Sequence, residues 1–250
     1  MEQFLNIFVT IILLSILYMY FESRSYDVTY VKSNIDNREY LVRNLSDKQM
    51  AADLLAKIRT GLVSMIGFLK NNNVEFLANN YLPGYNVNQN NGQNNGQNNE
   101  QNNGQNNGQN NGNQNNTNNR TPSQEEVNKL QEDLIRLQQR FNPDNLSEST
   151  PDKKYTSYSV NKGEKIVFCL RSKDERETLV RENIMMFVAL HELAHVMTKS
   201  VGHTEEFWNN FRFLLKVAIN QGLYQNINYN DTPKDYCGTT ITDTPLKEGV

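Results

Sequence analysis

The stretch that decides the fold runs from His191 to Phe211 and reads HELAHVMTKSVGHTEEFWNNF. It opens with the pattern His-Glu-x-x-His, in which His191 and His195 are four residues apart. On a helix this spacing places two imidazoles on one face, about a turn apart, so that both can bind one Zn²⁺. The residues from 179 to 197 are mostly apolar, which predicts a buried helix. Two histidines and a glutamate would lack hydrogen-bond partners there unless they served a site.

Glu192 and His203 complete the candidate site. Glu192 follows the first histidine, where a carboxylate can act as a general base in zinc-assisted hydrolysis. His203 is the last of the three histidines in the chain, and Gly202 before it is expected to end the helix and let the chain return to the metal. Three protein ligands with one position left open are typical of catalytic rather than structural zinc.

Four further residues leave alternatives open. Glu205 or Glu206 would supply the third ligand if His203 were only a surface residue. Cys237 is a distant candidate for a fourth ligand. Tyr236, which lies beyond the last predicted helix, is a candidate donor to an oxyanion, with simple packing as its alternative role.

The residues on either side predict the elements that would support this site. Residues 155–171 read YTSYSVNKGEKIVFCLR, which predicts a hairpin with its turn at 161–163 and a mostly buried strand at 166–170. A capping box at 172–175 predicts the start of a helix that continues to about 199. In the helix after His203, the spacing favours core positions over a substrate pocket for three side chains: Trp208, Phe211 and Leu215.

The amino-terminal residues predict a membrane anchor. Residues 4–21 read FLNIFVTIILLSILYMYF and contain no charge, glycine or proline; as a helix they span roughly 27 Å. A cleavable signal peptide is the alternative, but a basic n-region and a small-x-small cleavage site are both missing. Basic residues follow the span and none precedes it, so the positive-inside rule places the rest of the chain on the cytoplasmic side.

Composition divides the remaining chain. Residues 86–119 are almost entirely Asn, Gln and Gly and can bury no core, which predicts a solvated linker or insertion, with self-association as the alternative. Amphipathic patterns at 46–71 and 125–141 predict one helix on each side of it. We assign 28–85 to an N-terminal helical part and 120–245 to the core of the same domain, because 28–80 alone would bury too little.

Charge and cysteine content exclude several classes of protein. The chain has 25 basic and 28 acidic residues and a net charge of −3, so it shows no basic excess typical of a nucleic-acid-binding surface. Its two cysteines, Cys169 and Cys237, are too few for a disulfide scaffold and form no C-x-x-C pair. We expect them to be unpaired, in agreement with a reducing compartment.

Residues 191–211 resemble the WLM and SprT (Spartan)-type zinc metallopeptidases. Those families take a third histidine from a Gly-His-x-x-x-Phe element, which residues 202–207 match. The strand KIVFCL at 165–170 resembles their edge strand, which pairs with an extended substrate by β-addition. The arrangement as a whole is similar to the WLM-domain metallopeptidases of large DNA viruses.

This resemblance implies an α+β fold: a minimal zincin-like core, with a small sheet, an edge strand, the His-Glu-x-x-His helix and a following helix, behind an N-terminal transmembrane helix. It implies Zn²⁺ as cofactor, held by His191, His195 and His203, with Glu192 as base and a polypeptide as substrate. The predicted protein is a membrane-anchored metallopeptidase facing the cytoplasm or a virion interior. Two other classes stay open: a catalytically silent, membrane-tethered binding or virion structural protein with a zinc site, and a DNA–protein-crosslink repair protease.

Overall fold

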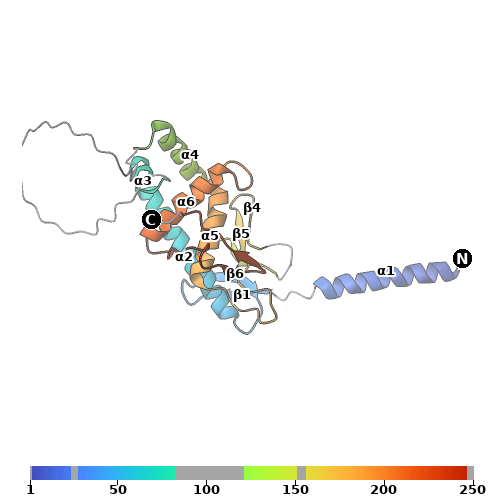
Figure 1. Ribbon diagram of the computed structural model, residues 1–250. Coiled ribbons are helices and arrows are strands. Elements are labelled where there is room, and N and C mark those ends of the chain that lie inside the picture. The colour runs from blue at the N-terminus through green and yellow to red at the C-terminus, as the bar shows by residue number, and fades with distance from the viewer. Residues whose placement is uncertain (1, 24–27, 83–120, 151–155, 247–250) are drawn as a thin grey trace, which may run out of the picture.

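The computed structural model describes residues 2–23, 28–82, 121–150 and 156–246, and its elements are arranged as in Figure 1. The predicted linker at 86–119 lies outside the described residues. The helices of the described chain are α1 (Glu2–Ser23), α2 (Lys48–Asn71), α3 (Val74–Tyr81), α4 (Gln124–Arg140), α5 (Glu182–Met197) and α6 (Glu205–Asn220). Its strands are β1 (Val28–Lys32), β2 (Glu39–Arg43), β3 (Leu146–Glu148), β4 (Tyr158–Val160), β5 (Lys165–Phe168), β6 (Lys234–Tyr236) and β7 (Thr239–Ile241).

Five strands form one mixed sheet in the order β1-β2-β3-β5-β4. The outer pairs, β1 with β2 and β4 with β5, are antiparallel, whereas β3 runs parallel to both β2 and β5. The predicted hairpin is therefore present, but the KIVFCL strand is not the edge strand that the sequence suggested. Its strand, β5, lies between β3 and β4, so the edge position belongs to β4.

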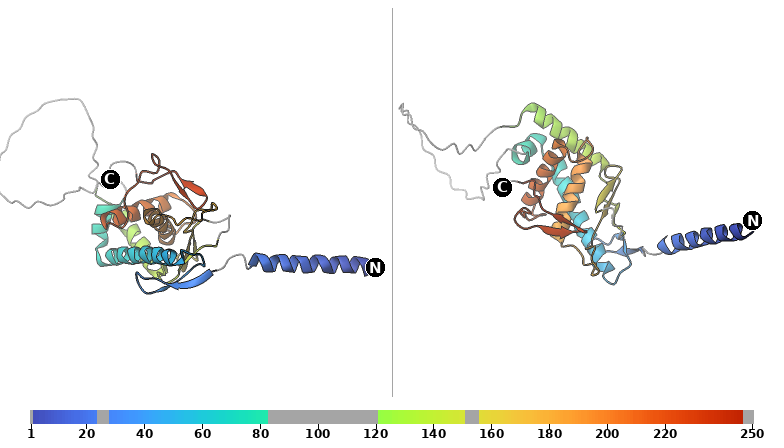
Figure 2. Two further views of the ribbon diagram at one scale, coloured as in Figure 1. Left: turned by 90° about the horizontal axis from the view of Figure 1, so that it is seen from below. Right: turned by 45° about the vertical axis from the view of Figure 1, so that its right-hand side comes forward.

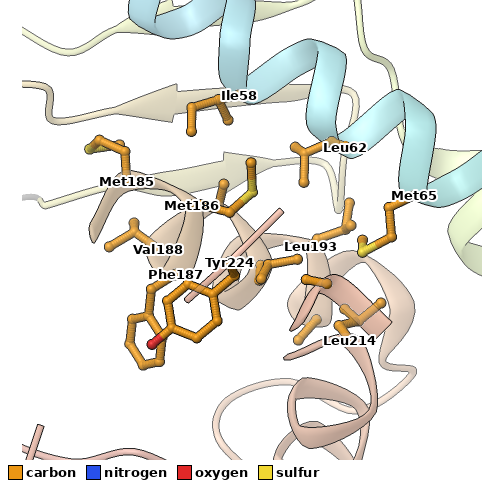
Figure 3. Close-up of a cluster of buried hydrophobic side chains, with 14 of the residues drawn as sticks. Ile58, Leu62, Met65, Met185, Met186, Phe187, Val188, Leu193, Leu214 and Tyr224 are labelled. Carbon is orange, nitrogen blue, oxygen red and sulfur yellow. The ribbon is translucent and has the colours of Figure 1, made fainter. Parts of the chain in front are cut away.

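Helices α2, α5 and α6 bury the hydrophobic core on one side of this sheet (Figure 2). Figure 3 shows side chains of α2, including Ile58, Leu62 and Met65, facing the apolar side chains of α5. Helix α5 is buried around nearly its whole circumference, because its apolar residues leave no polar face to turn toward water. The helix that carries the His-Glu-x-x-His pattern is thus held by the core itself.

Helix α5 begins later than the sequence predicted. The capping-box pattern at 172–175 does not start it; the helix begins at Glu182. The Ser172 hydroxyl instead lies 2.6 Å from a carboxylate oxygen of Asp174, and the Ser172 amide donates to the carbonyl of Thr178. These bonds close a turn, which shows how serine and aspartate side chains that can cap a helix can stabilise a loop equally well.

The predicted transmembrane anchor at 4–21 is wrong. Within the described part of the chain, no helix combines the length and the apolarity needed to cross a membrane. The predicted fold class included this anchor. So did the predicted localisation, a single-pass membrane protein with a cytoplasmic C-terminal domain. Both predictions are therefore wrong. The described chain has a mixed α/β fold.

The cysteines are also not as predicted, because Cys169 and Cys237 form a disulfide bond. The bond joins the chain just after β5 to the turn between β6 and β7, across 68 positions of sequence. Strands β6 and β7 pair with each other in a separate two-stranded sheet. The disulfide is therefore a direct covalent cross-link between this C-terminal hairpin and the end of β5 in the main sheet.

We expect the double substitution Cys169→Ser and Cys237→Ser to lower the free energy of unfolding by about 4 kcal/mol, because a cross-link over this separation restricts the unfolded chain. Urea denaturation of the oxidised wild type and the double variant measures the difference. Wild type denatured with a thiol reductant present serves as the control and should match the variant. A difference under about 1 kcal/mol would contradict this role.

Candidate metal centre

Three histidines from two segments meet at the carboxyl-terminal half of α5. His191 and His195 project from the helix, and His203 comes from the loop that precedes α6. The Nε2 atoms of His191 and His203 are 3.1 Å apart, and one ring nitrogen from each of the three histidines lies within 4.8 Å of the others. Among the described residues, these three side chains form the group that could hold a metal ion.

The loop that returns His203 to the helix is held by hydrogen bonds where it leaves α5. The ammonium group of Lys162, in the β4–β5 turn, donates to the carbonyls of residues 198, 199 and 200 at 3.1, 2.7 and 3.2 Å. The carboxylate of Glu206 accepts from the amides of residues 199 and 200. Gly202 has a φ of +85°, a conformation that glycine adopts without steric cost. The start of the loop is therefore fixed by Lys162 from the β4–β5 turn and by Glu206 from α6.

The two carboxylates that were alternatives to His203 have different surroundings. Glu206 is occupied by the loop amides and by the hydroxyl of Ser200, at 2.7 Å. Glu205 is exposed at the start of α6, and neither residue belongs to the cluster of metal-binding groups. Cys237 is bonded to Cys169, so it has no thiolate to offer a metal.

His191 and His195 are held as neutral imidazoles. Burial, reinforced by the neighbouring histidines, lowers the pKa of His191 to about 3. Burial also lowers the pKa of His195 to about 4, with repulsion from His203 and Lys162 acting in the same direction. The ring of Phe207 stacks on His195 with centroids 4.3 Å apart, which restricts the imidazole. Neutral imidazole is the form that binds metal.

Zn²⁺ fits this set of donors. Two nitrogen ligands about 2.0–2.1 Å from a tetrahedral zinc ion are about 3.3–3.4 Å from each other. The 3.1 Å between the nitrogens of His191 and His203 is close to that separation. Three imidazoles of borderline softness, with no thiolate in the cluster, are also a donor set found in catalytic zinc sites.

Glu192 lies beside the histidines and is 6 % exposed. Burial raises its pKa to about 7, and a hydrogen bond from the backbone amide of Ser159 opposes the rise. Ser159 belongs to β4, so the edge strand of the sheet and the helix α5 meet at this carboxylate. The arrangement gives Glu192 a position from which it can exchange a proton with a molecule in the cavity.

Tyr236 reaches the same cavity from the C-terminal hairpin. Its hydroxyl is 2.5 Å from the hydroxyl of Ser157, which accepts a hydrogen bond from the amide of Cys169 at 3.0 Å. Burial raises the pKa of Tyr236, the charge of Glu192 raises it further, and the bond to Ser157 opposes both. The phenol therefore stays protonated and can donate a hydrogen bond at neutral pH.

A cavity of about 550 Å³ joins these groups. Its lining includes the three histidines, Glu192 and Tyr236, which the sequence had singled out. It also includes residues 156–159 and residues 241–243, which the sequence analysis missed because only tertiary contacts bring them here. Phe211 and Leu215 are buried in the core, as predicted. Phe211 also lines the cavity, and so does Trp208, which is only partly buried; for these two the sequence had favoured the core over a pocket.

Comparisons with known proteins find a family and several relatives that match this chain. The WLM domain family matches residues 127–244. The chain is 30 % identical over 243 residues to R325, an uncharacterized protein of Acanthamoeba polyphaga mimivirus, and the match covers 97 % of each chain. It is 35 % identical over 82 residues to the uncharacterized protein 136R of Invertebrate iridescent virus 6, covering 32 % of this chain and 44 % of that one. No solved structure matches the chain.

We expect His203→Ala to weaken zinc binding at least about tenfold, because two imidazoles cannot replace the three-ligand set. Competition with a chromogenic chelator measures the affinity, and circular dichroism checks that the variant is folded. Glu205→Gln and Glu206→Gln are the matched controls and should keep one zinc per chain. If a carboxylate variant lost zinc while His203→Ala kept it, the third ligand would be a carboxylate.

Proposed function

The chain belongs to the WLM domain family, a metallopeptidase-like family, and from this premise we propose that it is a zinc-dependent peptidase that hydrolyses peptide bonds in polypeptides. The observation that carries the proposal is the meeting of His191, His195, His203 and Glu192 at one cavity. A site that only stabilised the fold would be expected to have four protein ligands and no cavity.

Each residue has a distinct role in the proposed reaction. His191, His195 and His203 hold Zn²⁺. When bound, Zn²⁺ supplies Lewis-acid chemistry, which acidifies water and polarises a carbonyl group. The Glu192 carboxylate accepts a proton from the attacking water and delivers it to the amine that leaves.

Tyr236 is proposed to donate a hydrogen bond to the carbonyl oxygen of the scissile peptide as negative charge develops there. Three observations support this role: Tyr236 lines the cavity, its raised pKa keeps it protonated, and its bond to Ser157 restricts the direction of its hydroxyl. A donor that is already oriented stabilises an oxyanion without reorganisation during the reaction.

The edge strand β4 is proposed to hold the substrate backbone. One side of β4 pairs with β5, with Ser159 opposite Ile166, and within the described chain no strand pairs with its other side. The amide of Ser159 points to Glu192, so the side of β4 that does not pair with β5 faces the site. An extended peptide added there would lie between β4 and α5, with its backbone beside the base.

Two other functions are less well supported. A catalytically silent protein that keeps a zinc site would not need Glu192, yet this carboxylate is buried next to the histidines at considerable electrostatic cost. A repair protease acting on DNA–protein crosslinks would gain from a basic surface, whereas the net charge is −3.

We expect Glu192→Gln to lower kcat/KM about 10²- to 10⁴-fold, because glutamine cannot accept the proton, while the bound zinc stays at one ion per chain. Cleavage of an unfolded protein, followed by mass spectrometry of new amino termini, measures activity. Tyr236→Phe should lower kcat about 10²- to 10³-fold with little change in KM. Equal activity of wild type and Glu192→Gln would contradict the proposed hydrolysis.

A further inference from the structure

An apolar part of the lining of the cavity adjoins the proposed metal site directly. Its walls are Phe187, Val188, Trp208, Phe211, Ile241 and Pro245, which we call the apolar subsite. The whole cavity, at about 550 Å³, has the size of sites that bind a drug-sized ligand or a few residues of a peptide. It has room beyond what the histidines and a water molecule need.

The first wall of the apolar subsite belongs to α5 and α6. Val188 precedes His191 and Glu192 by three and four residues, so the three share one face of the helix. The ring of Phe211 lies 5.3 Å from the ring of His191 and 5.2 Å from that of Phe187, centroid to centroid. Apolar surface thus begins within one helical turn of the groups that would carry out hydrolysis.

The second wall comes from the C-terminal segment. Ile241 is the last residue of β7, and Pro245 follows it. The hairpin that carries Ile241 is attached to the main sheet by the disulfide at Cys237. Both walls of the apolar subsite are therefore anchored, one by the core and the other by a covalent bond.

The charges that line the cavity indicate which side chains it would accept. No lysine or arginine is among the lining residues, and the carboxylates are Glu192 and Asp243. In the apolar part of the lining an acidic side chain would lose its hydration with no lysine or arginine to pair with, and Asp243, which lies between Ile241 and Pro245 in the chain, would repel it. A large apolar side chain would lose its contact with water and gain contact with the aromatic wall.

We propose that the apolar subsite binds a bulky apolar side chain of the substrate next to the scissile bond, such as phenylalanine or leucine, and selects against acidic ones. This inference rests on the proposed function, because the substrate is taken to be a polypeptide. It adds the specificity of that function, and it assigns Val188 as a residue that sets the size of the side chain accepted.

Binding can be tested without turnover. Trp208 is the only tryptophan of the chain and lines the cavity, so its fluorescence reports on occupancy. Zinc-loaded, full-length Glu192→Gln is titrated with peptides of one sequence that differ at a single position: Phe, Leu, Ala or Glu. We expect Phe and Leu to bind at least about tenfold more tightly than Ala, and Glu to bind most weakly.

Val188→Phe tests the position of the apolar subsite, because the larger ring fills the space beside His191. The expected result is a fall of at least about tenfold in the ratio of kcat/KM for the Phe peptide to that for the Ala peptide. A ratio is unaffected by a partial loss of folded protein. Ile135→Phe, at a residue of α4 that is 46 % exposed and outside the cavity, is the matched control and should leave the ratio unchanged.

The outcomes separate this inference from the proposed function. Cleavage by wild type with no preference among the four peptides, or a Phe-to-Ala ratio that Val188→Phe leaves unchanged, would overturn the apolar subsite and leave the peptidase standing. A preference for Glu, or for a Lys peptide added to the series, would overturn it as well. Preferential binding of Phe in the titration with no cleavage by wild type would support the apolar subsite and remove the hydrolytic function.

Discussion

The structure depends on the burial of one helix, α5, on almost every side. Its apolar residues pack against α2 and the sheet on one side and against α6 on the other, as Figure 3 shows for part of this core. The stabilisation from such burial is large and has no preferred direction. It lets the helix carry Glu192 and two histidines, groups that would be costly to bury in a helix held less firmly.

The position of His203 rests on a second constraint, the hydrogen bonding of the loop before α6. The loop leaves a helix end, where carbonyl groups lack helical partners. Lys162 satisfies three of the carbonyls that follow, and Glu206 satisfies two of the amides. Lys162, which the sequence places in a turn, and Glu206, which it offers as a possible ligand, thus fix the path of the backbone. That path determines where the imidazole of His203 lies.

The cavity also needs the C-terminal hairpin, which the main sheet does not hold by strand pairing. The disulfide from Cys169 to Cys237 places Tyr236 next to Ser157. It also brings Ile241 to the cavity that aromatic side chains of α5 and α6 line. The residues that would take part in hydrolysis and those that would bind the substrate side chain therefore come from segments far apart in the chain. The disulfide between Cys169 and Cys237 links these segments.

The sequence by itself determined the features that depend only on residues close together in the chain. The spacing of His191 and His195, the turn at 161–163 and the apolar periods of α2, α4 and α6 each depend on residues within a few positions of one another. Tertiary structure decided the rest: the edge position of β4, the disulfide, and the cavity role of Trp208 and Phe211. Each of these depends on contacts between segments that are distant in sequence, where packing and hydrogen bonding override local propensity. No local pattern contains that information.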